Sequence, residues 1–481
     1  MRLRKVESWI VFLIVFTFYG YFVKQGDWNI NSRLGLVKAV VEEHRLAIDS
    51  YHTGEFETED KAFIDGHYYS DKAFGASALG AIIYGVIHPF TGNITSYSSF
   101  VMLMTVLTIS LPTALLAPII YGLSIKYTKN RWFSLAIALS VCLGTAVFPY
   151  ASAFYGHALS ALTAFSAFSL WIDINLFNAK LTAHKSFLGG LLIGLLVITE
   201  YPTAIIALIL TGYIGYAAWK KNMLFSRNFL IPFLAGGGII LMLLLIYNKM
   251  VFGSPFTTGY SFNRFETFEE AFSRGYMGFE WPRANTLFLM TLHPTQGIFF
   301  QSPVLLIALA SVFWAIKKKI LKAEVITASA VIMAFLIAFS GVRLWWGGDA
   351  FSTRYVVAIF PFFTIFLLEM PKTWRLPFYS LGILSFFQML IASATTFNGL
   401  DLATKKIVET GEYFSSQSFS LYTILLPRLL KNKLTLTLGN HLLGIESWYF
   451  NLAIPVIIAL ALLMIFYITG RQPLISRSNQ A

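Results

Sequence analysis

Charged residues are scarce in this chain: they make up 12% of its 481 residues, whereas 56% are hydrophobic. A soluble domain of ordinary composition carries about twice that charged fraction. The only cysteine, Cys142, lies inside an apolar run, which excludes intrachain disulfides and thiolate metal sites. The sequence also lacks a Walker loop, a GxSxG elbow, an HExxH pair and a dinucleotide fingerprint. Nucleotide-driven chemistry is therefore disfavoured.

Long apolar runs are abundant, and the mean hydropathy is +0.65. Many of the runs approach the roughly 20 residues that cross about 30 Å of hydrocarbon as a helix. The first run follows MRLRK and lacks a small-residue cleavage site, so we expect a retained helix. We predict an all-α polytopic membrane protein with about 12 transmembrane helices. The predicted spans are 7–23, 97–124, 132–148, 157–178, 186–199, 202–218, 229–249, 299–316, 324–341, 354–369, 376–394 and 449–470.

A further apolar run, residues 73–90, decides the orientation of the chain. If it crosses, the basic loops KYTKNR, NAKLTAHK, WKKNMLFSRN, KKKILK and EMPKTWR all face outward. If it lies at the outer surface, these loops and the tail GRQPLISR are cytoplasmic, as the positive-inside rule requires. The run is also glycine-rich and closes with His88-Pro89. We therefore predict an outer-face juxtamembrane helix here, and both termini in the cytoplasm of a plasma or inner membrane.

The same topology predicts one membrane domain, residues 1–481, with long outer loops at 24–96, 250–298 and 395–448. Ten of the 24 acidic residues fall between Asp27 and Asp71. The net charge of +12 collects in the short basic loops rather than in a soluble domain. We expect a lipid bilayer as partner and no nucleic acid.

The first outer loop combines a predicted helix with charged groups. Apolar residues recur at helical spacing between Ser32 and Arg45, and either Asn31 or Ser32 could cap this stretch. The helix is too short to span, so we expect it to lie along the membrane surface. A surface helix, a polar loop and a second apolar helix would roof a pocket that admits a lipid chain from the side.

Such a pocket needs cations for a lipid phosphate and a carboxylate to accept a proton from an acceptor. Asp27 is the first candidate base, and each of these charges could instead be an ordinary solvated loop residue. The candidate cations on the same face are Arg33, Lys72, Arg343 and Arg354.

Two further places could contribute to a site. In VRLWWGGDAFSTRY, Trp345 and Trp346 are either interfacial anchors or flat surfaces for a sugar ring, and Asp349 and Arg354 follow them. Glu200 separates two short spans and either faces the pocket or is simply exposed at the outer end. In loop 250–298, Arg283 and His293 either bind an anion or are structural.

The elements YYSDKA-G, FGSPFTTGY, QGIFFQSPVLL and WWGGDAFSTRY, in this order after one span and an acid-bearing loop, resemble the GT-C class of polytopic glycosyltransferases. The resemblance is to the branch of the protein mannosyltransferases, the lipid A aminoarabinose transferases and their family 39-like relatives. It implies a polyprenyl-phosphate-linked sugar donor and transfer of a hexose or pentose on the outer face. It also implies that Asp27 is the base and that Asp71 and Lys72 lie near the donor phosphate.

The sequence departs from the family pattern at two points. Asp27-Trp28 stands where the family has Asp-Glu, and Arg33 follows six residues after Asp27 instead of three. Ala73-Phe74-Gly75 replaces the prolines that usually follow the lysine. Other acids therefore stay candidates for the base, namely Asp49, Asp60, Asp71 and Glu200.

Three functions remain open on the sequence. The first is sugar transfer from a polyprenyl-phosphate donor to an outer-face lipid, glycan or protein. The second is a surface-polysaccharide polymerase or ligase, and the third is a lipid-linked sugar flippase or transporter, which would place charges near the bilayer midplane. No cofactor is predicted, and no residue spacing indicates a divalent metal, although the sequence does not exclude one.

Overall fold

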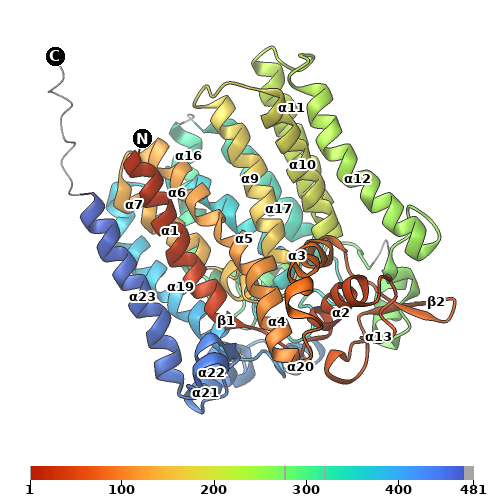
Figure 1. The fold of residues 1–481 in the computed structure, drawn as a ribbon. Coiled ribbons are helices and arrows are strands. Elements are labelled where there is room, and N and C mark those ends of the chain that lie inside the picture. The colour runs from red at the N-terminus through yellow and green to blue at the C-terminus, as the bar shows by residue number, and fades with distance from the viewer. Residues whose placement is uncertain (1, 276–277, 319–320, 471–481) are drawn as a thin grey trace.

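The computed structural model describes residues 2–275, 278–318 and 321–470, and this part of the chain is mostly helical, with very little sheet (Figure 1). Seven helices within it are long and apolar enough to cross a membrane. The prediction of an all-α polytopic membrane protein is confirmed at this level. The seven are Tyr97–Thr128, His157–Asn175, Tyr201–Lys220, Leu230–Phe252, Lys322–Ser340, Lys372–Ala394 and Trp448–Thr469.

A helical segment is present at each of the twelve predicted spans, although several are shorter than a full crossing, and the count of twelve stays a prediction. Residues 97–128 form one helical segment, in which the π-helical turn η2 lies directly before Leu111 and Pro112. The segments are α1 (Arg2–Tyr21), α4 (Tyr97–Thr105), η2 (Val106–Ser110), α5 (Leu111–Ala114), α6 (Leu116–Thr128), α7 (Arg131–Leu143), α8 (Val147–Ala151), α9 (His157–Asn175), α10 (Ala183–Thr199), η3 (Tyr201–Thr203), α11 (Ala204–Lys220), α12 (Leu230–Phe252), α16 (Val304–Lys318), α17 (Lys322–Ser340), η5 (Arg354–Phe362), α18 (Phe363–Leu368), η6 (Lys372–Trp374), α19 (Arg375–Ala394) and α23 (Trp448–Thr469).

The short basic loops gather at one end of the bundle, which we call the basic end; it lies uppermost in Figure 1. Contacts between helix ends and loops tie it together: Lys126–Asp173 at 2.5 Å, Asn175–Glu324 at 2.7 Å, Lys221–Asn178 at 2.6 Å, Lys318–Glu369 at 2.9 Å and Arg131–Glu7 at 2.9 Å. The start of α1 and the end of α23 also lie here, since Arg131 contacts both Glu7 and the carbonyl of Phe466. The predicted tail beyond residue 470 is outside the described residues. We call the opposite end the site end.

The first loop contains the helix that the sequence predicts, but the helix is placed differently. It begins at Trp28 rather than Ser32, because the Asp27 carboxylate caps it by accepting from the amides of Asn29 (2.9 Å) and Ile30 (3.3 Å). Residues 29–39 are all buried by protein, and the position of this helix along the membrane surface stays a prediction. The elements of this loop are β1 (Phe22–Val23), α2 (Trp28–Glu42), η1 (Gly54–Phe56), β2 (Lys61–Ile64), β3 (His67–Ser70) and α3 (Gly75–Thr91).

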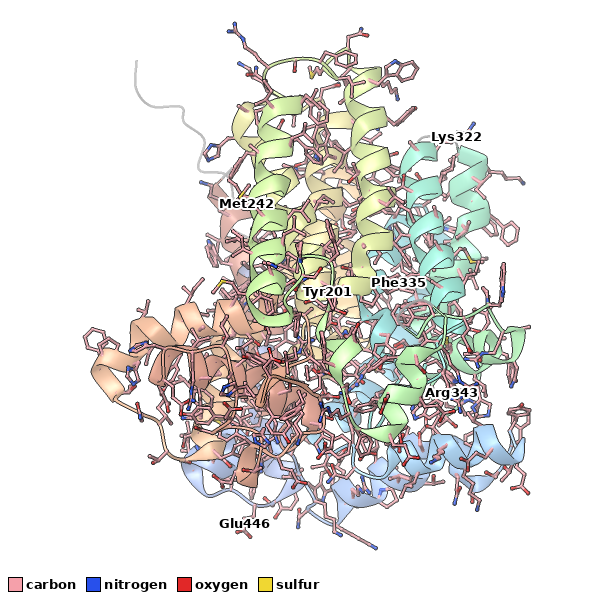
Figure 2. All side chains as sticks on the ribbon, turned by 90° about the vertical axis from the view of Figure 1, so that its right-hand side faces the viewer. Tyr201, Met242, Lys322, Phe335, Arg343 and Glu446 are labelled. Atoms are coloured by element: carbon pink, nitrogen blue, oxygen red, sulfur yellow. The ribbon has the colours of Figure 1, made fainter. Side chains whose placement is uncertain are left out.

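Helix α3 corresponds to the apolar run at 73–90. In Figure 2 the orange helix of the first loop runs sideways, across the direction of the upright green helices. One side of α3 packs on α2, where Tyr84 donates to Glu42 at 2.6 Å. The opposite stripe, formed by Ile82, Val86 and Phe90, is exposed, and Phe90 is 88% exposed. This orientation agrees with the prediction of a juxtamembrane helix.

The first and last outer loops are joined at the site end. Strand β1 pairs with β4, so that Phe22 faces Thr437. Lys24, two residues after Phe22, donates through Nζ to the carbonyls of Ala392 (2.6 Å) and Ser393 (3.0 Å) at the end of α19. The two later outer loops contain short helices that the sequence did not predict: η4 (Gly259–Phe262), α13 (Glu266–Ser273), α14 (Ala284–Thr291), α15 (Ile298–Gln301), α20 (Leu400–Thr410), η7 (Ser416–Phe419), η8 (Leu421–Leu425), α21 (Leu426–Leu430) and α22 (Leu438–Leu443), together with β4 (Leu436–Thr437).

Candidate functional site

Arg354 is a buried guanidinium group at the start of η5 that lacks a counter-ion in contact. It is 8% exposed; its Nη1 lies 3.4 Å from the Tyr155 hydroxyl, and its Nε has no hydrogen-bond partner. Within the described part of the chain it forms no ion pair within 4.0 Å, although the charge of Asp27 reaches it. A buried charge without a partner is costly. Arg354 is therefore poised to bind an anion.

The WWGG sequence explains how the chain wraps around this group. Gly347 and Gly348 have φ angles of 77° and 76°, which side-chain-bearing residues rarely adopt. A Cβ on Gly347 would lie 2.5 Å from the Arg354 Nε. The glycine pair thus turns the backbone directly against the guanidinium group.

Asp27 and two tyrosines complete the surroundings of Arg354. The guanidinium carbon lies 5.3 Å from the ring centre of Tyr155 and 5.4 Å from that of Tyr355. Tyr155 also lies within electrostatic reach of the Asp27 carboxylate. Burial and then the charge of Asp27 raise the pKa of Tyr155, so its hydroxyl stays protonated. A half-buried carboxylate and an unpaired cation are thus linked through one tyrosine.

Arg33, by contrast, is fully occupied by protein groups. Its three nitrogens donate to Asn29 Oδ1 (2.9 Å), the Ala73 carbonyl (2.7 Å) and Glu200 Oε1 (2.7 Å). Burial alone would raise the pKa of Glu200, but His157 and Arg33 beside it hold it below its usual value. Arg33 and Glu200 are a buried ion pair that locks α2 to the α10–α11 turn.

Lys72 is also balanced by protein charges. Its Nζ lies 2.9 Å from Asp60 Oδ1 and 3.2 Å from Asp71 Oδ1. Asn263, from the loop after η4, donates to Asp71 at 2.9 Å. Burial, together with the nearby Asp60, raises the pKa of Asp71 to about 6, although Lys72 opposes the shift. The Asp-Lys element is thus a compact buried triad of two acids and one base.

These groups lie close enough to share one electrostatic environment. Glu200 feels the positive charges of Arg33, Arg354 and Lys72. The structure therefore gathers most of the candidate residues from the first loop, from position 200 and from the WWGG segment at the site end. The residues so gathered are Asp27, Arg33, Asp71, Lys72, Glu200 and Arg354.

The tryptophan pair is packed inside the protein, and its role as a surface for a sugar ring stays a prediction. Trp345 and Trp346 are 2% and 7% exposed, so the interfacial-anchor interpretation is wrong and the rings are packed by protein. Trp346 Nε1 donates to Asp401 Oδ1 at 2.6 Å, and the amide of Asp401 donates to Asp349 Oδ1 at 2.9 Å. Burial and the negative charges of Asp401 and Asp27 raise the pKa of Asp349. This acidic rim borders the Arg354 site.

Other charged candidates lie elsewhere. Arg343 pairs with Glu270 at 3.0 Å near the surface, and Arg283 donates to the backbone carbonyl of Val342 at 2.5 Å. His293 contacts the carbonyl of Tyr413 and thus joins two loops. Asp49 is held on the β2–β3 hairpin by His67 at 2.8 Å. A structural role is therefore enough to explain each of these four residues.

The sequence interpretation overlooked Tyr155, His157, Tyr355 and Asp401. His157 opens α9 directly after a short polar loop, and an ionisable residue at the end of an apolar run is a signal for a functional position. In the described residues, no group of three or more His, Cys, Asp or Glu side chains could hold a metal ion.

No protein-family model matches the chain, and no curated protein matches it in sequence. Among solved structures, its fold is similar to the crystal structure of ArnT from Cupriavidus metallidurans bound to undecaprenyl phosphate. The TM-score is 0.48 and the sequence identity 10%, over 86% of this chain and 84% of that chain.

Proposed function

We propose that this chain is a membrane glycosyltransferase that moves a sugar from a polyprenyl-phosphate-linked donor to an acceptor at the site end. The observation that carries the proposal is the buried, unpaired Arg354 with the Asp27 carboxylate in its electrostatic reach. A phosphate supplies the counter-ion that Arg354 lacks, and guanidinium–phosphate hydrogen bonds are among the strong ones.

The arrangement supports a direct displacement. Asp27 accepts the proton of the acceptor hydroxyl or amine while the acceptor heteroatom attacks the anomeric carbon. The bond between that carbon and the phosphate oxygen breaks, and its electron pair stays on the phosphate. Arg354 stabilises the charge that develops there. Tyr155 lies near both groups: its hydroxyl is 3.4 Å from Arg354 Nη1, and the charge of Asp27 acts on it.

A lipid-linked donor fits the surroundings of the site better than a soluble one. The chain carries no phosphate-binding glycine loop, and α3 presents an exposed apolar stripe beside the site end. ArnT was solved with undecaprenyl phosphate, and we assign the same class of lipid to this chain on the charges of its own site. We further propose that the basic end is cytoplasmic and that transfer takes place on the outer face.

The test replaces Arg354 with glutamine in the purified full-length protein. Arg354→Gln should lose undecaprenyl phosphate binding in nanodiscs and slow transfer from a radiolabelled donor by about 100-fold or more. Arg343→Gln is the matched control, because Arg343 belongs to the same sequence motif but pairs with Glu270 near the surface. Arg354→Gln with unchanged lipid binding would refute the proposed phosphate site.

A further inference from the structure

His157 is a buried imidazole with one nitrogen in use and one free. It is 5% exposed, and its Nδ1 lies 3.5 Å from Glu200 Oε1. Its Nε2 is buried without a hydrogen-bond partner. Gly156 makes the approach to Glu200 feasible, since a Cβ there would stand 2.5 Å from Glu200 Oε1. Nδ1 thus has a charged partner, whereas the buried Nε2 has none.

The free nitrogen belongs to a place that favours anions. His157 is the first residue of α9, a 19-residue helix whose N-terminus carries the positive end of the helix dipole. The ring shares its neighbours with Arg354, since Tyr155 and Tyr355 lie 5.7 Å and 5.9 Å from it and also contact the guanidinium group. The charged and titratable groups that face His157 are Glu200, Arg33, Lys72, Arg354, Tyr150, Tyr155 and Tyr355.

We propose that His157 is a second phosphate-binding residue, which contacts through Nε2 the lipid phosphate held by Arg354. Glu200 acts as its positioning residue: the carboxylate accepts from Nδ1 and fixes the direction of the ring. This inference rests on the proposed function, because it concerns the same donor. His157 is not among the residues that the resemblance implies. In this proposal, binding of the phosphate changes the protonation state of the His157 ring.

The proposal implies proton uptake on binding. A neutral imidazole with its proton on Nδ1 directs a lone pair from Nε2 toward the phosphate, which is repulsive. The protonated ring donates to Glu200 and to the phosphate at the same time, so the bound anion favours it. Affinity for the lipid should therefore rise as the pH falls and decline as the pH rises between about 5 and 8.

The experiment measures equilibrium binding of undecaprenyl methyl phosphate to the full chain in nanodiscs across that pH range. This probe is a phosphodiester and has no titrating proton in the window, so any pH dependence reports the protein. The shorter side chain of His157→Asn keeps an amide near Glu200 but has no atom at the position of Nε2. This variant should bind the lipid about ten-fold more weakly at the acidic end of the pH range. His157→Gln places an amide near the Nε2 position and should retain part of the affinity without the pH dependence.

His67→Gln is the matched control, because His67 also pairs with a carboxylate, Asp49, but its side chain is 56% exposed on the β2–β3 hairpin. It should keep both the affinity and the pH dependence of the wild type. Wild-type affinity that does not change with pH would overturn the inference even if neither His157 variant folds. Unchanged binding in both His157 variants, with loss in Arg354→Gln, would overturn it and leave the proposed function standing. Unchanged binding in Arg354→Gln would instead remove the proposed function.

Discussion

Arg33, Lys72 and Arg354 are basic side chains buried at the site end, and they differ in what surrounds them. Arg33 donates to three protein oxygens, and Lys72 is bracketed by two carboxylates. Arg354 has one long contact, to a tyrosine hydroxyl. The resemblance places a lysine next to the donor phosphate, whereas the charge balance of this chain favours the arginine. Removing Lys72 would instead leave two buried acids without a cation.

Asp27→Asn separates the chemical role of Asp27 from its structural one. Asparagine caps helices about as well as aspartate, so α2 should form and the thermal midpoint should stay unchanged. Lipid binding should also persist, because Arg354 is untouched. Sugar transfer should fall by about 100-fold or more, since the general base is lost. Transfer at the wild-type rate would assign the base to another acid.

The raised pKa of Asp71 predicts how stability varies with pH. The folded state holds this proton with a pKa of about 6, against about 3.8 for an ordinary aspartate, so it binds more protons than the unfolded chain between these values. The midpoint of thermal unfolding should therefore fall as the pH rises from about 4 to about 6. Asp71→Asn removes the titrating group and should flatten this part of the profile; a slope that survives the substitution belongs to another residue.

At the residue level the sequence could indicate positions but not partners. Asp27, Lys72 and Arg354 stand out as charges at the ends of apolar runs. Nothing in their spacing reveals that Asp60 and Asp71 neutralise Lys72, whereas Arg354 has no carboxylate in contact within the described residues. Those facts depend on packing between segments far apart in the chain. Glu200 illustrates the same limit, because its partner Arg33 lies in another loop.

Among the elements, the apolar runs were the most predictable part of the fold. A run of apolar residues specifies a membrane helix by its own composition, so each predicted span coincides with a helical segment. The β2–β3 hairpin was missed, although Asp65-Gly66 is a typical turn pair for it, with φ angles of 49° and 87°. The start of α2 was misplaced because Asn31 and Ser32 also have capping side chains.

The crossing of α10 and α12 depends on two glycines. A methyl group on Gly190 would overlap the carbonyl oxygen of Phe233, and one on Gly236 would overlap that of Phe187. Gly190→Ala should force the helices apart and destabilise the protein by about 1–3 kcal/mol, seen as a lower thermal midpoint in detergent. Gly238→Ala on the partner helix α12 is the control, because nothing lies within 4 Å of its added methyl group. Equal midpoints for the two variants would contradict this close approach.

For the molecule as a whole, the single buried Cys142 makes the topology directly measurable. Glu55→Cys and Thr95→Cys stand before and after α3, and Lys180→Cys stands in a basic loop. If α3 does not cross, a membrane-impermeant maleimide applied to intact cells should label both positions that flank it and leave Lys180→Cys unlabelled. Lys180→Cys should react after permeabilisation. Labelling of only one of the two flanking positions would mean that α3 spans the membrane.

The clip between β1 and β4 has a consequence for biogenesis. Phe22 is synthesised long before its partner Thr437. At about 5–20 residues per second, the time between the synthesis of the two residues is roughly 20–80 seconds. During that time Lys24 lacks the end of α19, and the first loop, with Asp27 directly after it, is not held against the rest of the site end. A nascent chain interrupted before its last outer loop would therefore insert most of its helices without assembling the site end. The order of synthesis thus delays assembly of the site end until the chain is nearly complete.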